Sequence, residues 1–283
     1  MSNLNFSLSA LYLHPVKSCA GMAVNEALLV ETGLDLDRAW MVVDPNGEFV
    51  SQRELPRMAL IQPTLRHDDL RLRAPGMLAL HLSFDRVEAP TRAHVWNDWV
   101  AAYDMGDLAA QWFTDFLGRS LRLVRFDIDQ PRLSDSRWTA GLDAQTQFAD
   151  AFALLVLSKA SLDGFNRRLA LDGGTAVDMR RFRPNLVLDG IEAHDEDHID
   201  ELHIDTDDGE VRLKLVKPCA RCSIPDVDPD TAVFGHAVGD VLATYRADAR
   251  VGGALTFGMN AVVLEGVDRV LRVGQTGRAR IAF

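Results

Sequence analysis

The segment KPCARCSIPDVDPDT, at residues 217–231, restricts the structure of this chain of 283 residues more than any other part of it. It places Cys219 and Cys222 among basic residues and follows them with two prolines. Proline lacks a backbone donor and disfavours helical geometry in the residue before it, so a helix cannot run through the segment. Neighbouring cations favour the thiolate form of cysteine, which is a nucleophile or a soft metal ligand. We therefore expect a reactive or metal-binding thiol on a loop.

The composition excludes several classes of protein. The formal net charge is −11, which opposes non-specific attraction to nucleic acid or to anionic membranes. No apolar stretch approaches the roughly 18 residues of a membrane span, and the first residues do not follow the signal-peptide pattern. Three cysteines are an odd number, which argues against a disulfide framework. We expect a soluble cytoplasmic protein that binds neither nucleic acid nor membrane.

Turn residues divide the first half of the chain into short apolar runs typical of β-strands. The motif DPNG at residues 44–47 predicts a hairpin turn, with positive φ at its Asn-Gly pair. A helix is expected at about residues 107–117, where apolar side chains recur every four residues and Gly118 can end it. The polar, irregular segment at residues 127–147 predicts a linker or lid, and thus a domain boundary near residue 125.

The second half mixes the two kinds of element. An apolar strand at residues 152–158 precedes a helix that Ser158 or Ser161 can cap. Further strands lead into the cysteine segment, and short strands are expected from residue 240 to the end. The pattern indicates an α+β fold with β structure in excess.

Three interpretations of the Cys-x-x-Cys pair stand beside one another. Free cysteines are often simply buried as small apolar side chains. A thioredoxin-like redox pair is disfavoured, because that motif needs a helix that begins at the first cysteine. A zinc site would need further ligands from elsewhere in the chain. The candidates are Cys19, His14, His203 and His236.

Basic residues outside this segment indicate an anionic ligand. Lys17 and Ser18 end the first strand, Arg38 begins another, and Arg183 precedes a third. Each of these could be a solvated surface charge. Together, however, a planar arginine fork, a lysine point charge and a hydroxyl donor are what a protein of negative net charge needs to hold a phosphate. We predict a cationic pocket closed by the cysteine segment.

Several spaced motifs resemble the MOSC family, which is named after the C-terminal domain of molybdenum cofactor sulfurase. VKPCARCSIPDVDPDT resembles the MOSC signature, and LYLHPVKSCAGMAV, FALLVLSKASLDGFNRRL, RRFRPNLVL and LTFGMNAVV extend the resemblance over nearly the whole chain. The longer members include the mitochondrial amidoxime-reducing component and bacterial relatives. The resemblance implies an N-terminal β-barrel-like domain at residues 1–125 and a MOSC domain at residues 126–283, built on a β-barrel with flanking helices.

The resemblance also implies a molybdopterin-type molybdenum cofactor. By position, Cys222 would be the metal ligand and the catalytic residue, and Cys219 would have a supporting role. The residues that would bind the rest of the cofactor are Lys17, Ser18, Arg38, Asp150, Arg183, Asn185 and Arg221.

The activity implied by the resemblance is an oxidoreductase for N-oxygenated compounds such as hydroxylamines, amidoximes and N-hydroxylated bases. Electrons would come from a separate protein of the ferredoxin, flavodoxin or cytochrome b type, because the four-cysteine iron–sulfur extension of some relatives is missing. The alternatives are a cofactor carrier, a sulfur-transfer protein with a persulfide on Cys222, and a protein that binds pyridoxal phosphate. Two departures from the family pattern are Ala232, in place of a glycine, and SIPD at residues 223–226, which we expect to affect substrate preference.

Overall fold

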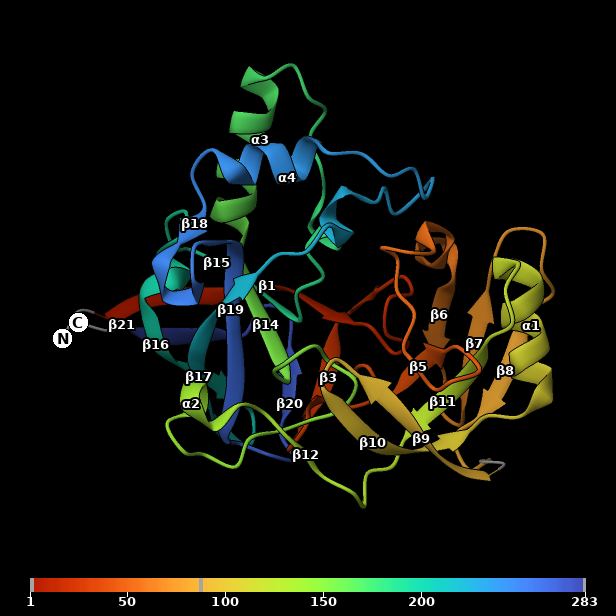
Figure 1. Ribbon diagram of the computed structural model, residues 1–283. Helices are drawn as coiled ribbons and strands as arrows, with labels where there is room; N and C mark the ends of the chain where they lie inside the picture. Colours follow the sequence, from red (N-terminus) through yellow and green to blue (C-terminus); the bar gives the residue numbers. More distant parts are fainter. Residues whose placement is uncertain (1–2, 87–88, 282–283) are drawn as a thin grey trace.

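The computed structural model describes residues 3–86 and 89–281 of the chain. Figure 1 shows two lobes, one a β-barrel with helices α3 and α4 at its upper end and the other a smaller β-rich lobe that carries helix α1. The first and last described residues lie together on the side of the barrel away from the smaller lobe. The β-rich α+β fold is therefore confirmed.

Seven strands form the closed barrel. In their order around it they are β14 (Leu154–Ser158), β15 (Leu186–Asp189), β1 (Asn3–Leu13), β21 (Thr276–Ile281), β16 (Ile199–Thr206), β17 (Gly209–Ala220) and β19 (Ala254–Glu265). The barrel closes because β14 pairs with β19. The β14–β15 pair is parallel, whereas β14–β19 is antiparallel.

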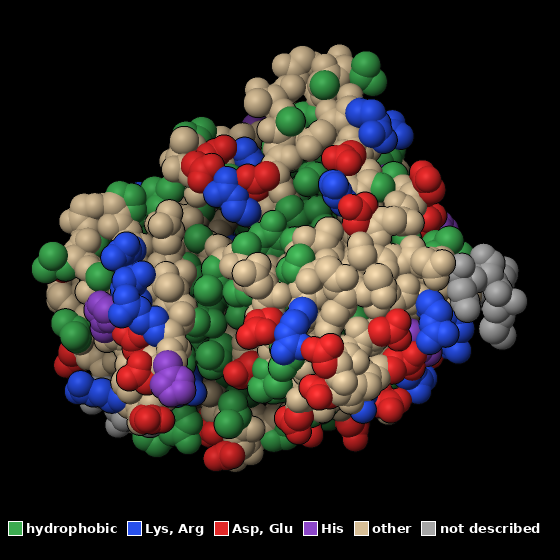
Figure 2. Space-filling view, turned by 180° about the vertical axis from the view of Figure 1, so that it is seen from behind, with side chains coloured by type: hydrophobic (Ala, Val, Ile, Leu, Met, Phe, Trp, Pro, Cys, Tyr) green, Lys and Arg blue, Asp and Glu red, His purple; other side chains and the backbone are tan. Residues whose placement is uncertain are grey.

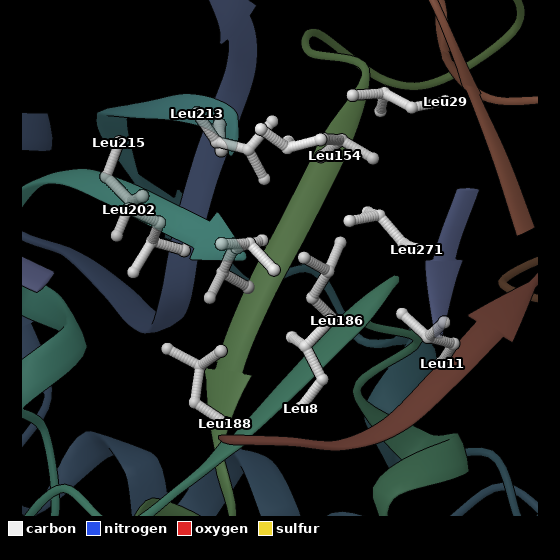
Figure 3. Packing of buried hydrophobic residues seen from close by; sticks show 14 of the residues in the cluster. Leu8, Leu11, Leu29, Leu154, Leu186, Leu188, Leu202, Leu213, Leu215 and Leu271 are labelled. Atoms are coloured by element: carbon white, nitrogen blue, oxygen red, sulfur yellow. The ribbon is translucent and has the colours of Figure 1, made fainter. Parts of the chain in front are cut away.

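Leucines fill the barrel. Strand β17 alternates buried and half-exposed residues, so that Val211, Leu213 and Leu215 point inward together. Figure 3 shows leucines of several other strands meeting them in the interior. They include Leu8, Leu11, Leu154, Leu186, Leu188 and Leu202. The barrel interior is thus a packed core, and a binding site must lie at its edge.

The smaller lobe contains two antiparallel sheets. One consists of β5 (Trp40–Val43), β11 (Arg122–Phe126), β10 (Asp98–Asp104) and β9 (Ala89–Val95). The other consists of β6 (Gln62–Leu65), β7 (Asp69–Arg73) and β8 (Leu80–Ser83). Helix α1 (Asp107–Leu117) shares one apolar core with both sheets, through Trp112, Phe113 and Phe116.

Strands from the start of the chain belong to the barrel lobe. Strand β1 pairs with β15 and β21, and β2 (Met22–Val24) pairs with β1. Strand β3 (Glu26–Val30) pairs with β4 (Gly33–Leu34) and with β20 (Val270–Arg272). The split into residues 1–125 and 126–283 stays a prediction, but these pairings join the two parts at several strands.

The remaining elements include helix α3, which has 13 residues, and several shorter pieces. They are η1 (Pro56–Leu60), β12 (Arg132–Leu133), α2 (Ser136–Thr139), β13 (Gln145–Thr146), α3 (Lys159–Leu171), η2 (Met179–Arg181), η3 (Asp195–His198), η4 (Ile224–Asp226), α4 (Ala237–Ala243), β18 (Ala247–Asp248) and η5 (Ala249–Val251).

Most of the local predictions are confirmed. Helix α1 ends at Gly118, whose φ is 71°, and the Ser158 hydroxyl caps α3 by accepting from the Ser161 N–H. The DPNG turn forms, but of its Asn-Gly pair only Gly47 has positive φ. The prediction of short strands alone from residue 240 onward is wrong, because helix α4 overlaps the start of that region and β19 is 12 residues long.

The surface carries mixed charge. On the face shown in Figure 2, acidic and basic side chains are interspersed, and hydrophobic side chains gather in the middle of the view, between the two lobes. Among the described residues, no helix is long and apolar enough to cross a membrane.

A buried carboxyl group beside α3 makes the stability depend on pH. Glu196 is fully buried and accepts from the Ser158 N–H at 3.1 Å, while its second oxygen has no hydrogen-bond partner within the described residues. Desolvation raises the pKa of Glu196 above its usual range. The protonated carboxyl therefore stabilises the fold fully below the unfolded pKa of about 4.3, and this contribution is lost as pH rises through the folded pKa.

We expect Glu196→Gln to be more stable than the wild type by a margin that grows as the pH is raised above about 5. Urea unfolding at a series of pH values measures this margin. Asp205→Asn, which changes an exposed carboxylate on β16, is the matched control and should show no such trend. A constant difference between Glu196→Gln and wild type across the pH series would contradict the prediction.

Candidate functional site

A cavity of about 210 Å³ is lined by all eight residues that the family resemblance assigns to the cofactor and the metal, but not by the zinc candidates Cys19, His14, His203 and His236. The eight lining residues are Lys17, Ser18, Arg38, Asp150, Arg183, Asn185, Arg221 and Cys222. The smaller lobe also contributes Phe49 and Arg53 to the cavity wall, and the barrel contributes Lys217 and Asn260. The lining thus holds six Lys and Arg side chains against the single carboxylate of Asp150, in a chain whose net charge is negative.

Lys17 lies on the inner wall of the cavity. Its side chain is only 6% exposed, and its ammonium donates to the Phe148 carbonyl at 2.7 Å and forms an ion pair with Asp150. Burial lowers the pKa of Lys17, and the neighbouring carboxylate of Asp150 partly offsets that effect. The cation is fixed in place by the groups around it.

The carboxylate of Asp150 is the counter-charge of the cavity. Desolvation raises its pKa, but the charge of Lys17 and hydrogen bonds from Lys17 and Trp96 together outweigh this and hold the pKa below its usual range. Trp96 Nε1 donates to Asp150 Oδ1 at 3.1 Å. The buried guanidinium of Arg132 holds the preceding backbone by donating to the Gln147 and Ala149 carbonyls.

Asn185 joins Arg38 to the barrel. Its Oδ1 accepts from Arg38 Nη1 at 3.0 Å and from the Leu155 N–H at 3.1 Å, and its Nδ2 donates to the Tyr12 carbonyl. Most of the amide's hydrogen-bonding capacity is therefore used within the protein. Arg38 is held further by Asp37 and by the Arg183 carbonyl.

Backbone conformation singles out the same region. Ser18, Arg38 and Arg183 have φ values of 63°, 52° and 57°, in the left-handed region that non-glycine residues rarely adopt. Such residues persist only where the surrounding structure enforces them, and they concentrate at functional sites. Burial, together with repulsion from Arg38, lowers the pKa of Arg183 to about 10, and its Nη1 donates to the Cys19 carbonyl at 2.6 Å.

The two cysteines of the segment differ in their surroundings. The sequence predicts a loop for both cysteines, but Cys219 lies on the last residues of β17. This strand continues its pairing with β19 as far as Ala220. Arg221 Nη1 lies 3.2 Å from the Cys219 sulfur and Nη2 donates to the Phe182 carbonyl at 2.8 Å. Cys222 is exposed, and no hydrogen bond to its sulfur is present among the described residues. Its thiol is thus free to bind a ligand in the cavity.

Cys19 has a different environment. It is fully buried beneath the cavity, and burial raises the pKa of its thiol to about 12. All three cysteines are free, as the odd number predicted. Among residues 3–86 and 89–281, no group of three or more His, Cys, Asp or Glu side chains is arranged to hold a metal ion. The zinc interpretation therefore gains no support, whereas a metal that brings its own ligands needs only one thiolate from the protein.

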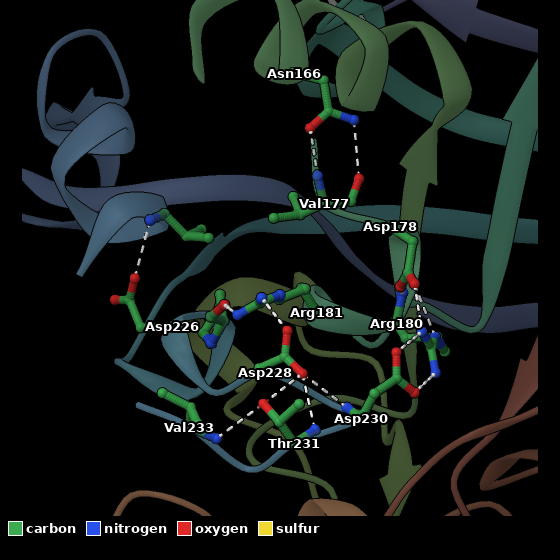
Figure 4. A network of polar contacts seen from close by, with 12 residues as sticks. Asn166, Val177, Asp178, Arg180, Arg181, Asp226, Asp228, Asp230, Thr231 and Val233 are labelled. Atoms are coloured by element: carbon green, nitrogen blue, oxygen red, sulfur yellow. Dashed lines mark hydrogen bonds and ion pairs between the residues drawn. The ribbon is translucent and has the colours of Figure 1, made fainter. Parts of the chain in front are cut away.

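The acidic residues after Cys222 fasten the segment to its neighbours, as Figure 4 shows. Asp228 forms an ion pair with Arg181 at 2.8 Å, and Asp230 forms one with Arg180 at 2.8 Å. Asp226 Oδ1 accepts from the Val238 and Gly239 N–H groups at the start of α4, at 2.9 and 3.1 Å. These contacts hold the part of the segment that follows Cys222 against its neighbours.

Ala232 follows these acidic residues and has a φ of 59°. A left-handed conformation costs an L-residue about 1–2 kcal/mol, which exceeds the entropy that glycine adds to the unfolded chain. We expect Ala232→Gly to raise the free energy of unfolding by about 0.5–1 kcal/mol, measured by urea denaturation. Ala170→Gly, at an exposed position in the last turn of α3, should instead lower it, by up to about 1 kcal/mol. Destabilisation by both changes would contradict this assignment of strain.

Comparison with known proteins identifies the family to which this chain belongs. Residues 5–120 match the MOSC N-terminal beta barrel domain, and residues 143–277 match the MOSC domain. The chain belongs to the MOSC family.

Named relatives of this MOSC protein include the mitochondrial amidoxime reducing component 2 of Bos taurus, which is 36% identical over 85% of this chain and 72% of the relative. The mitochondrial amidoxime-reducing component 1 of Homo sapiens is 35% identical over the same shares of the two chains, 85% and 72%. A crystal structure of the YUAD protein of Bacillus subtilis covers 100% of this chain and 99% of that one, at 10% identity and a TM-score of 0.45. That score is too low to support an argument about function.

The sequence motifs did not reveal three side chains of the MOSC site: Phe49 and Arg53 in the cavity wall, and Trp96 beside it. They come from the smaller lobe, and their approach to Asp150 depends on how the two lobes pack. No local pattern marks them. Lys217, the first residue of the cysteine segment, also lines the cavity, at the point where the β17–β19 register shifts between Leu215 and Lys217.

Proposed function

We propose that this MOSC protein is a molybdenum-cofactor enzyme that reduces N-oxygenated compounds with electrons from a separate protein. The observation that carries the proposal is the cavity itself, where, among the described residues, six cationic side chains face one carboxylate and the Cys222 thiol has no partner. Relatives that are about 35% identical are named for amidoxime reduction. Hydroxylamines, amidoximes and N-hydroxylated bases form the proposed substrate class.

The chemistry of the lining fits a phosphate-bearing, sulfur-rich cofactor. We assign its phosphate and polar ring to Lys17, Ser18, Arg38, Arg183 and Arg221, whose charges and donors suit an anion. The Ser18 hydroxyl has no hydrogen-bond partner among the described residues, and the buried Arg221 Nε is also unsatisfied. Asn185 would act mainly by positioning Arg38. Asp150 would hold Lys17 and lie beside the cofactor.

The reaction takes up two electrons and two protons and converts R–NHOH into R–NH2 and water. When bound, the molybdenum cofactor would supply the two-electron redox chemistry that cleaves the N–O bond. The chain would supply Cys222 as a soft thiolate ligand, cations that neutralise the cofactor, and walls that orient the substrate. Lys17 holds its proton between Asp150 and the Phe148 carbonyl, which keeps a fixed positive charge in the cavity.

A cofactor carrier or sulfur-transfer protein is the second candidate, because the Cys222 thiol is exposed and could bear a persulfide. Two assays on the cofactor-loaded protein separate the candidates. The first follows benzamidoxime turnover with reduced methyl viologen as electron donor, and the second follows transfer of intact cofactor to an apo-molybdoenzyme. We expect turnover without transfer. Transfer without turnover would make the protein a carrier, and a protein that carries pyridoxal phosphate but no molybdenum would contradict both.

A further inference from the structure

Arg53 stands apart from the other arginines of the cavity. Arg38, Arg183 and Arg221 each donate to a carbonyl or carboxylate oxygen of the protein. Arg53 also lines the cavity, but among residues 3–86 and 89–281 no oxygen accepts a hydrogen bond from its guanidinium and no carboxylate pairs with it. Its five N–H donors are therefore available to a ligand.

Two aromatic rings hold this guanidinium in place. Its central carbon lies 5.7 Å from the ring centroid of Phe49 and 5.2 Å from that of Trp96. The two rings themselves lie 5.3 Å apart. Cation–π attraction uses the face of the guanidinium and leaves the N–H groups at its edge free, so the rings orient Arg53 without consuming its donors.

Trp96 is itself fixed beside the cavity. Its Nε1 donates to Asp150 Oδ1, which lines the cavity. Its backbone has a φ of 57°, which is unusual for a bulky residue, and its side chain remains 46% exposed. A strained and partly exposed tryptophan tied to the site by a hydrogen bond indicates a functional position more than a packing position. Arg53, Phe49 and Trp96 thus form a preorganised cationic wall.

We propose that Arg53 determines substrate specificity by binding a carboxylate on the N-oxygenated substrate, an inference that rests on the proposed reductase function. A guanidinium fork matches the two oxygens of a carboxylate. The lysine and the three arginines assigned to the cofactor each donate to a protein oxygen, whereas the guanidinium of Arg53 has no partner beyond the two rings in the part of the chain that the structure describes. The preferred substrates are accordingly small N-hydroxylated compounds with an acidic group, and cationic ones are repelled.

The test compares benzamidoxime with 4-carboxybenzamidoxime, which differ by one carboxylate. For each variant, the ratio of kcat/KM for the acidic substrate to that for the neutral substrate is measured with reduced methyl viologen. We expect Arg53→Gln to lower this ratio by about tenfold or more, mainly through KM, since a charge-assisted hydrogen bond is lost. Arg57→Gln is the matched control, because Arg57 stacks on Phe116 at 4.4 Å, is exposed and does not line the cavity.

Binding of both compounds by calorimetry and molybdenum content are measured in the same preparations. If the wild-type protein binds the acidic compound more tightly but reduces neither compound, the proposed function is contradicted. In that case, loss of the binding preference in Arg53→Gln would still support the role of Arg53. An unchanged ratio in Arg53→Gln, or no wild-type preference for the acidic compound, would overturn the inference. Loss of molybdenum from Arg53→Gln alone would also overturn it and assign Arg53 to the cofactor.

Discussion

Replacing Cys222 by serine should lower benzamidoxime turnover by the cofactor-loaded protein by more than about a hundredfold, because loss of even an outer partner of a metal site costs 10–100-fold. Cys222 is exposed in the cavity, so serine fits there without disturbing the core. Turnover per bound molybdenum, with reduced methyl viologen as donor, is the quantity to measure. Dividing turnover by the amount of bound molybdenum distinguishes a less active metal site from a protein that has simply lost its cofactor.

Cys219→Ser is the matched control for this substitution. Its sulfur contacts Arg221 at the end of β17, so the change should have a much smaller effect on turnover. Full activity of Cys222→Ser per bound molybdenum would refute the assignment of Cys222. Equal losses in both variants would mean that the pair acts as a unit, as in sulfur transfer, and would also count against a single metal ligand.

Lys17→Gln should weaken cofactor retention by about tenfold to a hundredfold, since a hydrogen bond to a charged group contributes about 1.5–3 kcal/mol. The change removes a buried cation from the cavity wall but leaves Asp150 60% exposed, so the unpaired carboxylate can be hydrated. We therefore expect a folded protein with a low molybdenum content. Molybdenum per chain after dialysis, with thermal unfolding as a check on the fold, measures this effect.

The control for Lys17 is Lys159→Gln. Lys159 pairs with Asp189 at 3.4 Å on the surface, so its loss removes the same charge from the chain without touching the cavity. A variant Lys17→Gln that keeps as much molybdenum as Lys159→Gln would exclude Lys17 from the cofactor site. A variant that loses molybdenum only because it unfolds would show a lowered Tm, which distinguishes the two causes.

The cavity could be predicted from the sequence because its residues fall within short motifs. Lys17 with Ser18, Arg38, and Arg183 with Asn185 each follow or precede a strand, and strands bring their ends together at one edge of a sheet or barrel. What the motifs could not give was which partner each side chain uses. Arg221, which the resemblance assigns to the cofactor, also contacts the Cys219 sulfur and donates to the Phe182 carbonyl.

Long-range contacts account for the structural features that the sequence did not predict. Helix α4 is short and contains Gly239, so its sequence alone is a weak helix signal. Asp226, from the cysteine segment, caps it, and a Cβ at position 239 would lie only 2.9 Å from the Asp226 carboxylate, so a larger residue there would displace the capping group. Arg53 and Trp96 meet only after separate segments of the smaller lobe have folded. Neither contact leaves a local sequence pattern.

The central claim is that the cavity holds a molybdenum cofactor, and the most direct test is the joint content of molybdenum and pterin in protein purified from a host that makes this cofactor. Elemental analysis gives the metal, and fluorescence after oxidation gives the pterin. We predict about one of each per chain, retained through gel filtration and released together on unfolding. A folded protein that contains neither molybdenum nor pterin would contradict the account.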